Sequence, residues 1–120
     1  MSDNYTFPKK VRLIRKTQFQ EILAKEPPVL EKFFAFYYQK NGLMYPRLGI
    51  ITAKKKFRLA VLRNRIKRQV RESFRHYRSR LPGIDMVIVA RQGTREASQC
   101  ELRQCLDNGF LKLIGNCSEE

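Results

Sequence analysis

The longest regular pattern of apolar residues lies just past the middle of the chain. Apolar side chains recur there at intervals of three or four residues, at Leu62, Ile66, Val70, Phe74, Tyr77 and Leu81. Because an α-helix turns once in about 3.6 residues, this spacing predicts a helix from about Leu59 to Arg80 with one apolar arc. Pro82 and Gly83 then end the helix.

Three other segments have the character of β-strands. Residues 32–39 are short, dense in aromatic side chains and bounded by turn formers, and residues 47–53 predict a second strand. The turn signal Asn41-Gly42 lies between them, so we expect the two strands to pair antiparallel. Residues 86–90 are continuously apolar and rich in β-branched side chains, which is typical of a strand buried on both faces.

Two capping boxes mark the starts of further helices. Thr17 with Gln20 predicts a short helix to about Lys25, which is ended by Pro27-Pro28. Ser98 with Glu101 opens a final helix, whose core-facing residues are expected to be Leu102, Cys105, Leu106 and Leu113.

The length of 120 residues fits one domain, and we expect residues 1–8 and 115–120 to be mobile ends. We find neither a signal peptide nor an apolar run of the roughly 18 residues that span a bilayer. Three cysteines without a CxxC or Cys/His pattern argue against a disulfide framework and a zinc site. They are interpreted as reduced thiols of a cytoplasmic protein.

The amount and distribution of charge give the clearest indication of a binding partner. The net charge is +14 and the pI near 10.2. Residues 54–80 hold twelve lysines and arginines against one acid, Glu72. Such a concentration of positive charge calls for a polyanion, either a nucleic acid or an anionic membrane surface.

The predicted basic helix allows a decision between a nucleic acid and a membrane surface. Its charged residues lie opposite the apolar arc, and arginine outnumbers lysine, which favours bidentate bonds to phosphate. A membrane helix would leave its apolar face for lipid, whereas the flanking strands need that face for the core. A merely solvated face would alternate signs, and this one does not. The pattern therefore indicates nucleic acid.

The aromatic strand offers a second candidate surface. Alternation puts Phe34, Phe36 and Tyr38 on one face and Phe33, Ala35 and Tyr37 on the other. One set must pack the core. The other, together with Phe19, could stack unpaired bases beside Arg12, Arg15 and Lys16. Any single aromatic of this strand is more often a core residue than a base platform.

Catalytic groups are hard to find. His76 is the only histidine, and we interpret it as a contact to phosphate or solvent rather than a base. The acids are scattered at spacings that build neither a metal cluster nor an acid/base couple. The sequence therefore predicts a binding protein with no catalytic residues and no metal ligands of its own.

Specific stretches resemble the bacterial ribonuclease P protein subunit. The signature stretches are Ala53-Lys54-Lys55, Ala60-Val61-Leu62-Arg63-Asn64-Arg65-Ile66-Lys67-Arg68 and Arg71-Glu72. Arg12-Leu13 with Phe19-Gln20, Pro46-Arg47-Leu48-Gly49 and the run from Asp85 to Arg91 follow the same family in order. The resemblance thus covers nearly the whole chain.

The resemblance implies an α+β fold: a single-domain α-β sandwich with a mostly antiparallel or mixed sheet of about four strands, three helices and a left-handed βαβ crossover. It also implies a role. The protein would join a catalytic RNA in the ribonuclease P holoenzyme, which removes the 5′ leader of precursor tRNA using Mg²⁺ held mainly by the RNA. Catalysis would reside in that RNA. The alternative is a ribosomal protein or RNA chaperone that uses the same basic helix.

The resemblance also assigns binding residues. Expected contacts to the RNA subunit are Lys54, Lys55, Arg63, Asn64, Arg65, Lys67, Arg68, Arg71 and Arg75. The cleft that holds the single-stranded leader would be lined by Arg12, Lys16, Phe19, Phe36 and Tyr38. The expected partners are the catalytic RNA and precursor tRNA in the cytoplasm, with no membrane and no protein partner required.

Overall fold

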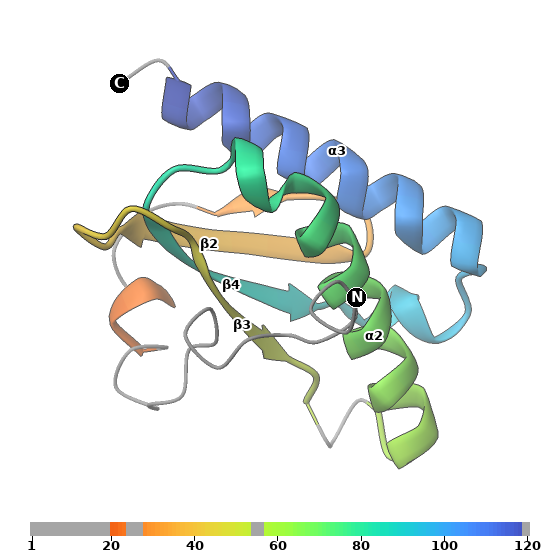
Figure 1. Cartoon of the computed structure of the whole chain (residues 1–120). Helices are drawn as coiled ribbons and strands as arrows, with labels where there is room; N and C mark the ends of the chain where they lie inside the picture. Colours follow the sequence, from red (N-terminus) through yellow and green to blue (C-terminus); the bar gives the residue numbers. More distant parts are fainter. Residues whose placement is uncertain (1–19, 24–27, 54–56, 119–120) are drawn as a thin grey trace, which may run out of the picture.

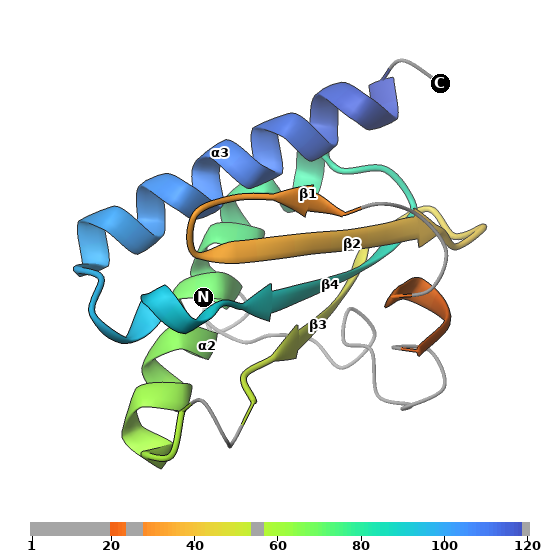
Figure 2. The ribbon, with the colours of Figure 1, turned by 180° about the vertical axis from the view of Figure 1, so that it is seen from behind.

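The computed structural model describes residues 20–23, 28–53 and 57–118. The predicted capping box at Thr17 and the N-terminal basic segment lie outside this part of the chain. A four-stranded sheet carries two long helices on one face, α2 (Ala60–Tyr77) and α3 (Gln99–Ser118) (Figure 1). Seen from behind, the sheet lies in front of both helices (Figure 2). Residues 20–23 are helical and pack on the opposite face, where Ile22 clusters with Val87.

The sheet is mixed. Its strands are β1 (Val29–Leu30), β2 (Phe34–Lys40), β3 (Arg47–Ile51) and β4 (Ile84–Ala90), in the spatial order β1-β2-β4-β3. β2 pairs antiparallel with β1 and with β4, and β3 pairs parallel with β4. The predicted antiparallel pairing of residues 47–53 with residues 32–39 is therefore wrong. β4 lies between these strands because its continuous apolar run needs cover on both faces.

The connection from β3 to β4 runs through α2 and is left-handed. Figure 1 shows α2 in front of the sheet, with β3 and β4 both pointing to the right and β4 above β3. Figure 2 confirms that α2 lies on that side. A right-handed crossover is the usual arrangement of such a unit. The resemblance implied the exception, which a hydrophobic pattern cannot reveal.

The main core lies between the helices and the sheet. α2 contributes Ile66, Val70 and Phe74, which are at most 1% exposed, as the apolar arc predicted. The helix ends in a short 3-10 turn, η3 (Arg78–Arg80). All four residues that the sequence assigned to the core from the final helix are buried: Leu102, Cys105, Leu106 and Leu113.

The capping box at the start of α3 is confirmed. The Ser98 amide donates to the Glu101 carboxylate at 2.9 Å, and the Glu101 amide donates to the Ser98 hydroxyl at 3.1 Å. These bonds lower the pKa of Glu101, mainly because the Ser98 amide stabilises the charged carboxylate. A second 3-10 turn, η4 (Gln92–Arg95), precedes this cap. The start of α3 is thus fixed by its own sequence.

Candidate nucleic-acid interface

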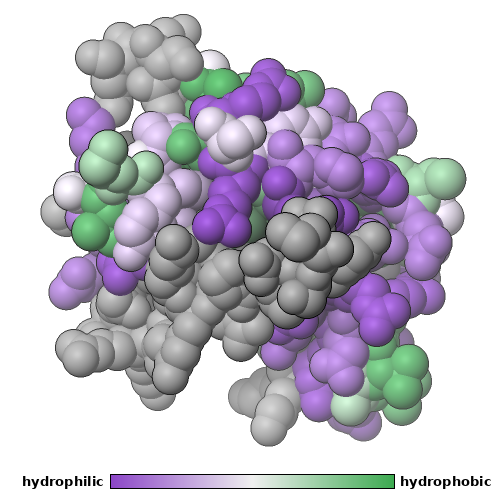
Figure 3. Space-filling model, viewed as in Figure 1, coloured by the Kyte–Doolittle hydropathy of each residue, from purple (hydrophilic) through white to green (hydrophobic). Residues whose placement is uncertain are grey.

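The outward face of α2 is cationic. Asn64, Arg65, Arg68, Arg71 and Arg75 are exposed, and Lys67 is half-buried. The space-filling view shows hydrophilic residues gathered on the side where α2 and α3 lie (Figure 3). Since the apolar arc of the helix packs into the core, its charged arc faces outward, where a ligand can reach it. Of the predicted contacts, Lys54 and Lys55 lie outside the described residues.

The first turn of α2 adds to this surface. The turn carries no acidic residue, and within the described part of the chain no side chain caps the helix at Leu59. The unpaired amides at a helix N-terminus and the helix dipole both favour an anion. A phosphate bound at this end would therefore meet the backbone amides of Ala60 to Leu62, about one turn before Asn64 and Arg65.

Arg63 stabilises the protein itself, in addition to its predicted contact with RNA. Its Nη1 donates to the Phe57 carbonyl at 2.7 Å and to the Arg58 carbonyl at 3.0 Å. Phe57 is fully buried, and these bonds hold the segment that enters α2 against the helix. Part of the Arg63 guanidinium is thus already engaged by the protein.

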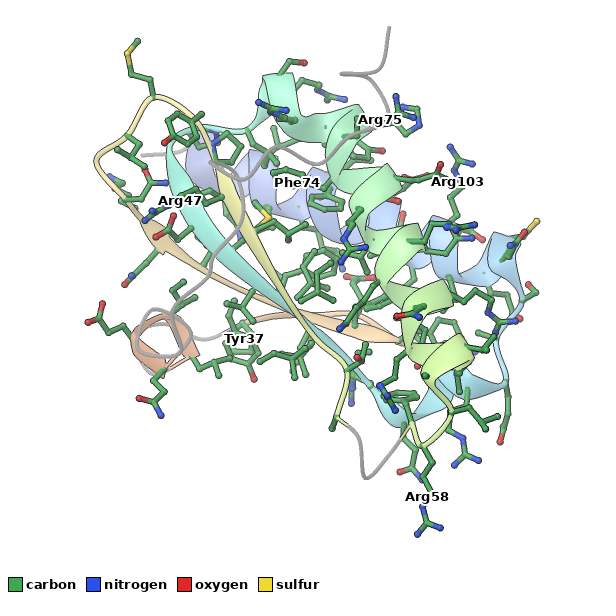
Figure 4. The ribbon with its side chains drawn as sticks, turned by 60° about the horizontal axis from the view of Figure 1, so that its bottom comes forward. Tyr37, Arg47, Arg58, Phe74, Arg75 and Arg103 are labelled. Carbon is green, nitrogen blue, oxygen red and sulfur yellow. The ribbon has the colours of Figure 1, made fainter. Side chains whose placement is uncertain are left out.

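The second candidate surface is the sheet face opposite α2 and α3. Ile22 and Val87 are fully buried there, and Leu23, Tyr37, Ile51 and Val89 pack around them half-buried. Figure 4 shows Tyr37 on the side of the sheet that faces the helical turn at residues 20–23. The predicted cleft residues Arg12, Lys16 and Phe19 lie outside the described residues.

The two strand aromatics predicted for the cleft lie on the sheet face that α3 covers. Phe36 is fully buried beneath α3, where its ring meets Phe110 edge-on at a centroid distance of 5.4 Å. Tyr38 packs against the same core, and its hydroxyl accepts a bond from Asn116 of α3 at 3.5 Å. Long helices cover this face, so Phe36 has no surface to offer a base. The prediction that Phe36 contacts a base is therefore wrong, and Tyr37 is the β2 aromatic that lies on the face of residues 20–23.

An ion pair anchors the end of the same sheet face. Arg47 donates from Nε and Nη2 to the two carboxylate oxygens of Asp85, both at 2.7 Å. The hydrogen bonds to Asp85 raise the pKa of Arg47, so this guanidinium stays charged. Asn41 also donates to Asp85, at 2.9 Å, and to the Tyr45 carbonyl at 3.2 Å. The network fixes the β2–β3 loop, in which Gly42 has a φ of +73°.

The described residues offer little to a metal ion. No three His, Cys, Asp or Glu side chains gather there in a way that could hold one. Asp85 is already bound by Arg47 and Asn41. In the described part of the chain, moreover, no helix is both long and apolar enough for a membrane span. The surface chemistry is that of polyanion binding.

Comparison with known proteins identifies the family of this chain. The sequence matches the Ribonuclease P family over residues 7–114. The chain belongs to the bacterial ribonuclease P protein family. The ribonuclease P protein component of Nitrosococcus oceani is 38% identical over 115 residues, covering 96% of this chain and 97% of the relative. That of Pseudomonas aeruginosa is 39% identical over 111 residues, covering 92% and 82%.

Solved structures agree with the fold. The Staphylococcus aureus RNase P protein has a TM-score of 0.79 at 31% identity, covering 85% of this chain and 94% of that one. The Thermotoga maritima RNase P protein has a TM-score of 0.74 at 30% identity, covering 84% and 96%. The protein is thus an RNA-binding subunit of ribonuclease P that serves tRNA 5′ processing. The alternative of a ribosomal protein or RNA chaperone has no support.

Proposed function

We propose that this protein uses the two faces of one sheet for two RNAs. The helix side binds the catalytic RNA subunit through the outward face of α2. The opposite side holds the single-stranded 5′ leader of precursor tRNA against Tyr37 and the residues around it. The observation that carries this proposal is that the charged arc of α2 and the Tyr37 surface lie on opposite sides of the sheet.

The charge and shape of α2 support the first half of the proposal. The RNA-binding residues on α2 would be Asn64, Arg65, Lys67, Arg68, Arg71 and Arg75, together with the part of the Arg63 guanidinium that the protein does not engage. Lys54 and Lys55, which precede the helix in the sequence, would add to them. Arginine suits this role because its planar fork bonds two phosphate oxygens at once. An A-form RNA displays mostly phosphate and ribose to a helix of this kind.

Tyr37 supports the second half. It is half-buried among apolar neighbours, so its ring is held in place and loses little conformational freedom on binding. Unpaired bases stack on such rings without sequence preference, which suits leaders of different sequence. Arg12, Lys16 and Phe19 are further candidates from the N-terminal segment.

We assign Mg²⁺ to the holoenzyme, held mainly by RNA rather than by this chain. The described residues do not fit a protein-held metal, because their carboxylates are dispersed and Asp85 is engaged by Arg47. The contribution of the chain is its positive charge, which screens closely spaced phosphates. The proposed partners are the catalytic RNA and precursor tRNA, in the cytoplasm, without a required protein partner.

Reconstituted leader cleavage tests the proposal. Adding the protein to the RNA subunit is expected to lower the Mg²⁺ concentration needed for half-maximal cleavage, because protein cations replace part of the metal atmosphere. The measurement is a Mg²⁺ titration of cleavage with and without protein. Two substrates that differ only in leader length, a single nucleotide against several, would be compared. Identical titration curves with and without the protein would contradict the proposal.

Tyr37→Ala is expected to weaken the preference for precursor over mature tRNA by roughly 5- to 30-fold, since one base–aromatic stack contributes about 1–2 kcal/mol. Binding of mature tRNA is expected to stay unchanged. Competitive binding of the two tRNAs to the holoenzyme measures this ratio. Tyr38→Ala is the matched control, because Tyr38 is the neighbouring strand residue on the other face. An equal effect of both variants would argue against the assigned face.

A further inference from the structure

The seam between α2 and α3 carries cations that the proposed RNA surface does not include. His76 of α2 and Arg103 of α3 are both exposed, and Arg103 Nη2 lies 3.3 Å from His76 Nε2. Figure 4 shows Arg103 reaching up beside α2. Arg80, from the turn after α2, places its guanidinium carbon 5.5 Å from the centre of the Tyr77 ring. We call His76, Arg80 and Arg103 the seam cluster.

The seam cluster consists of two guanidinium groups and one imidazole, and two acids lie near it. Asp107 of α3 and Glu72 of α2 are the nearby acids. Asp107 lies close enough to Tyr77 to act on its hydroxyl. Burial and Asp107 raise the pKa of Tyr77, whereas Arg80 and Arg103 act in the opposite direction. Arg80, Arg103 and Asp107 therefore all lie near the Tyr77 side chain.

Contacts between surface helices commonly join opposite charges, because such pairs stabilise the contact slightly. At this seam a guanidinium instead meets an imidazole. The imidazole accepts a bond from Arg103 only while Nε2 is unprotonated, and a protonated ring would repel the guanidinium. An anion placed over the pair would accept bonds from both groups. The arrangement therefore favours a phosphate ligand.

The position of the seam cluster indicates which RNA would supply the phosphate. Helical spacing places Arg65, Arg68, Glu72 and His76 along one flank of α2, the flank that faces Arg103, so this flank carries two arginines and one carboxylate before the seam. Arg65 and His76 are eleven residues apart, which is about 16 Å along the helix axis. A backbone that contacts Arg65 and continues along this flank would reach the seam.

We propose that the seam cluster is a second phosphate-binding site, which takes the backbone of the catalytic RNA subunit beyond the segment that contacts Arg65 and Arg68. This inference rests on the proposed function, because the ligand is the RNA subunit. It extends the RNA surface from one helix to two and assigns a binding role to α3. Arg103 is the residue on which the site depends most, because it is the only member of the seam cluster that α3 contributes.

Salt-dependent binding tests the seam cluster. Arg103→Ala and Arg80→Ala are each expected to weaken binding of the RNA subunit about three- to tenfold. Each is also expected to lower the slope of log Kd against log salt concentration by about one, which corresponds to the loss of one phosphate contact. Lys112→Ala is the matched control. It removes the same charge from α3, but lies nine residues from Arg103 and so on the opposite side of the helix. Because Lys112 also forms an ion pair with Glu31, the thermal stability of this variant is measured alongside its binding.

The single histidine gives a direct readout. The imidazole C–H signal of His76 is expected to shift when the full protein binds the RNA subunit, and to stay in place with precursor tRNA alone. An unchanged salt slope in Arg103→Ala, or a response only to precursor tRNA, would overturn the inference. If Arg65→Ala/Arg68→Ala still weakens binding in that case, the proposed function survives. If neither the seam variants nor that pair changes binding, the proposed function fails as well.

Discussion

Replacing Arg65 and Arg68 together by alanine is expected to weaken binding of the RNA subunit by roughly 30- to 1,000-fold. Each charge-assisted bond to phosphate contributes about 1–2 kcal/mol, and two of them give about 2–4 kcal/mol. The slope of log Kd against log salt concentration is expected to fall by about two. Direct binding of the labelled RNA subunit at several salt concentrations measures both quantities.

These two positions separate binding from folding. Arg65 and Arg68 are exposed, so their truncation is expected to change the free energy of unfolding by no more than about 0.5 kcal/mol. Arg63 is less suitable, because it also holds the Phe57 and Arg58 carbonyls. Lys112→Ala again supplies a charge-matched control. A double variant that binds as tightly as the unaltered protein, with an unchanged salt slope, would exclude this face of α2 from the interface.

The parts of the fold that local chemistry dictates could be predicted from the sequence. The period of the apolar residues identified α2 and its buried arc, and Ile66, Val70 and Phe74 are all in the core. The Ser98–Glu101 box marked the start of α3. In both cases the stabilising contact lies within one or two helical turns, so neighbours in sequence contain the necessary information.

Strand pairing depended on contacts that are distant in sequence. The turn signal at Asn41-Gly42 favoured a hairpin of residues 32–39 with 47–53, yet β4 lies between these strands. That loop instead takes part in the Asn41–Asp85–Arg47 network. Asp85 follows Asn41 by 44 positions in the sequence and follows Arg47 by 38. Nothing near Asn41 in the sequence indicates that its partner is Asp85.

The sequence pattern also could not show which face of β2 is buried in the core. Alternation correctly separated Phe36 and Tyr38 from Tyr37, but both sets contain aromatic residues. Which set is buried depends on where α3 docks. Gly109 explains the outcome, because a Cβ there would lie 2.1 Å from the Phe36 ring. α3 approaches β2 closely at that point and covers Phe36, and Tyr37 is left on the side of residues 20–23.

Phe36→Ala is the second change with a large expected effect, and the effect is on stability. Removing a fully buried phenylalanine leaves a cavity and is expected to lower the free energy of unfolding by about 3–5 kcal/mol. The surrounding wall is formed by Phe110 and the backbone of Gly109, which limits how far the site can collapse. The melting temperature is expected to fall by roughly 10–25 °C, as measured by thermal unfolding.

A milder variant distinguishes a core role from a leader contact if Phe36→Ala fails to fold. Phe36→Leu keeps an apolar side chain in the core and is expected to retain full discrimination between precursor and mature tRNA, at a smaller cost in stability. Tyr37→Ala is expected to show the opposite combination, with a smaller stability loss than Phe36→Ala and a clear loss of discrimination, because its ring is half-buried on the leader side. If a folded Phe36→Leu protein lost that discrimination while Tyr37→Ala kept it, the leader would have to contact the face that α3 covers. The Tyr37 surface would then be wrongly assigned.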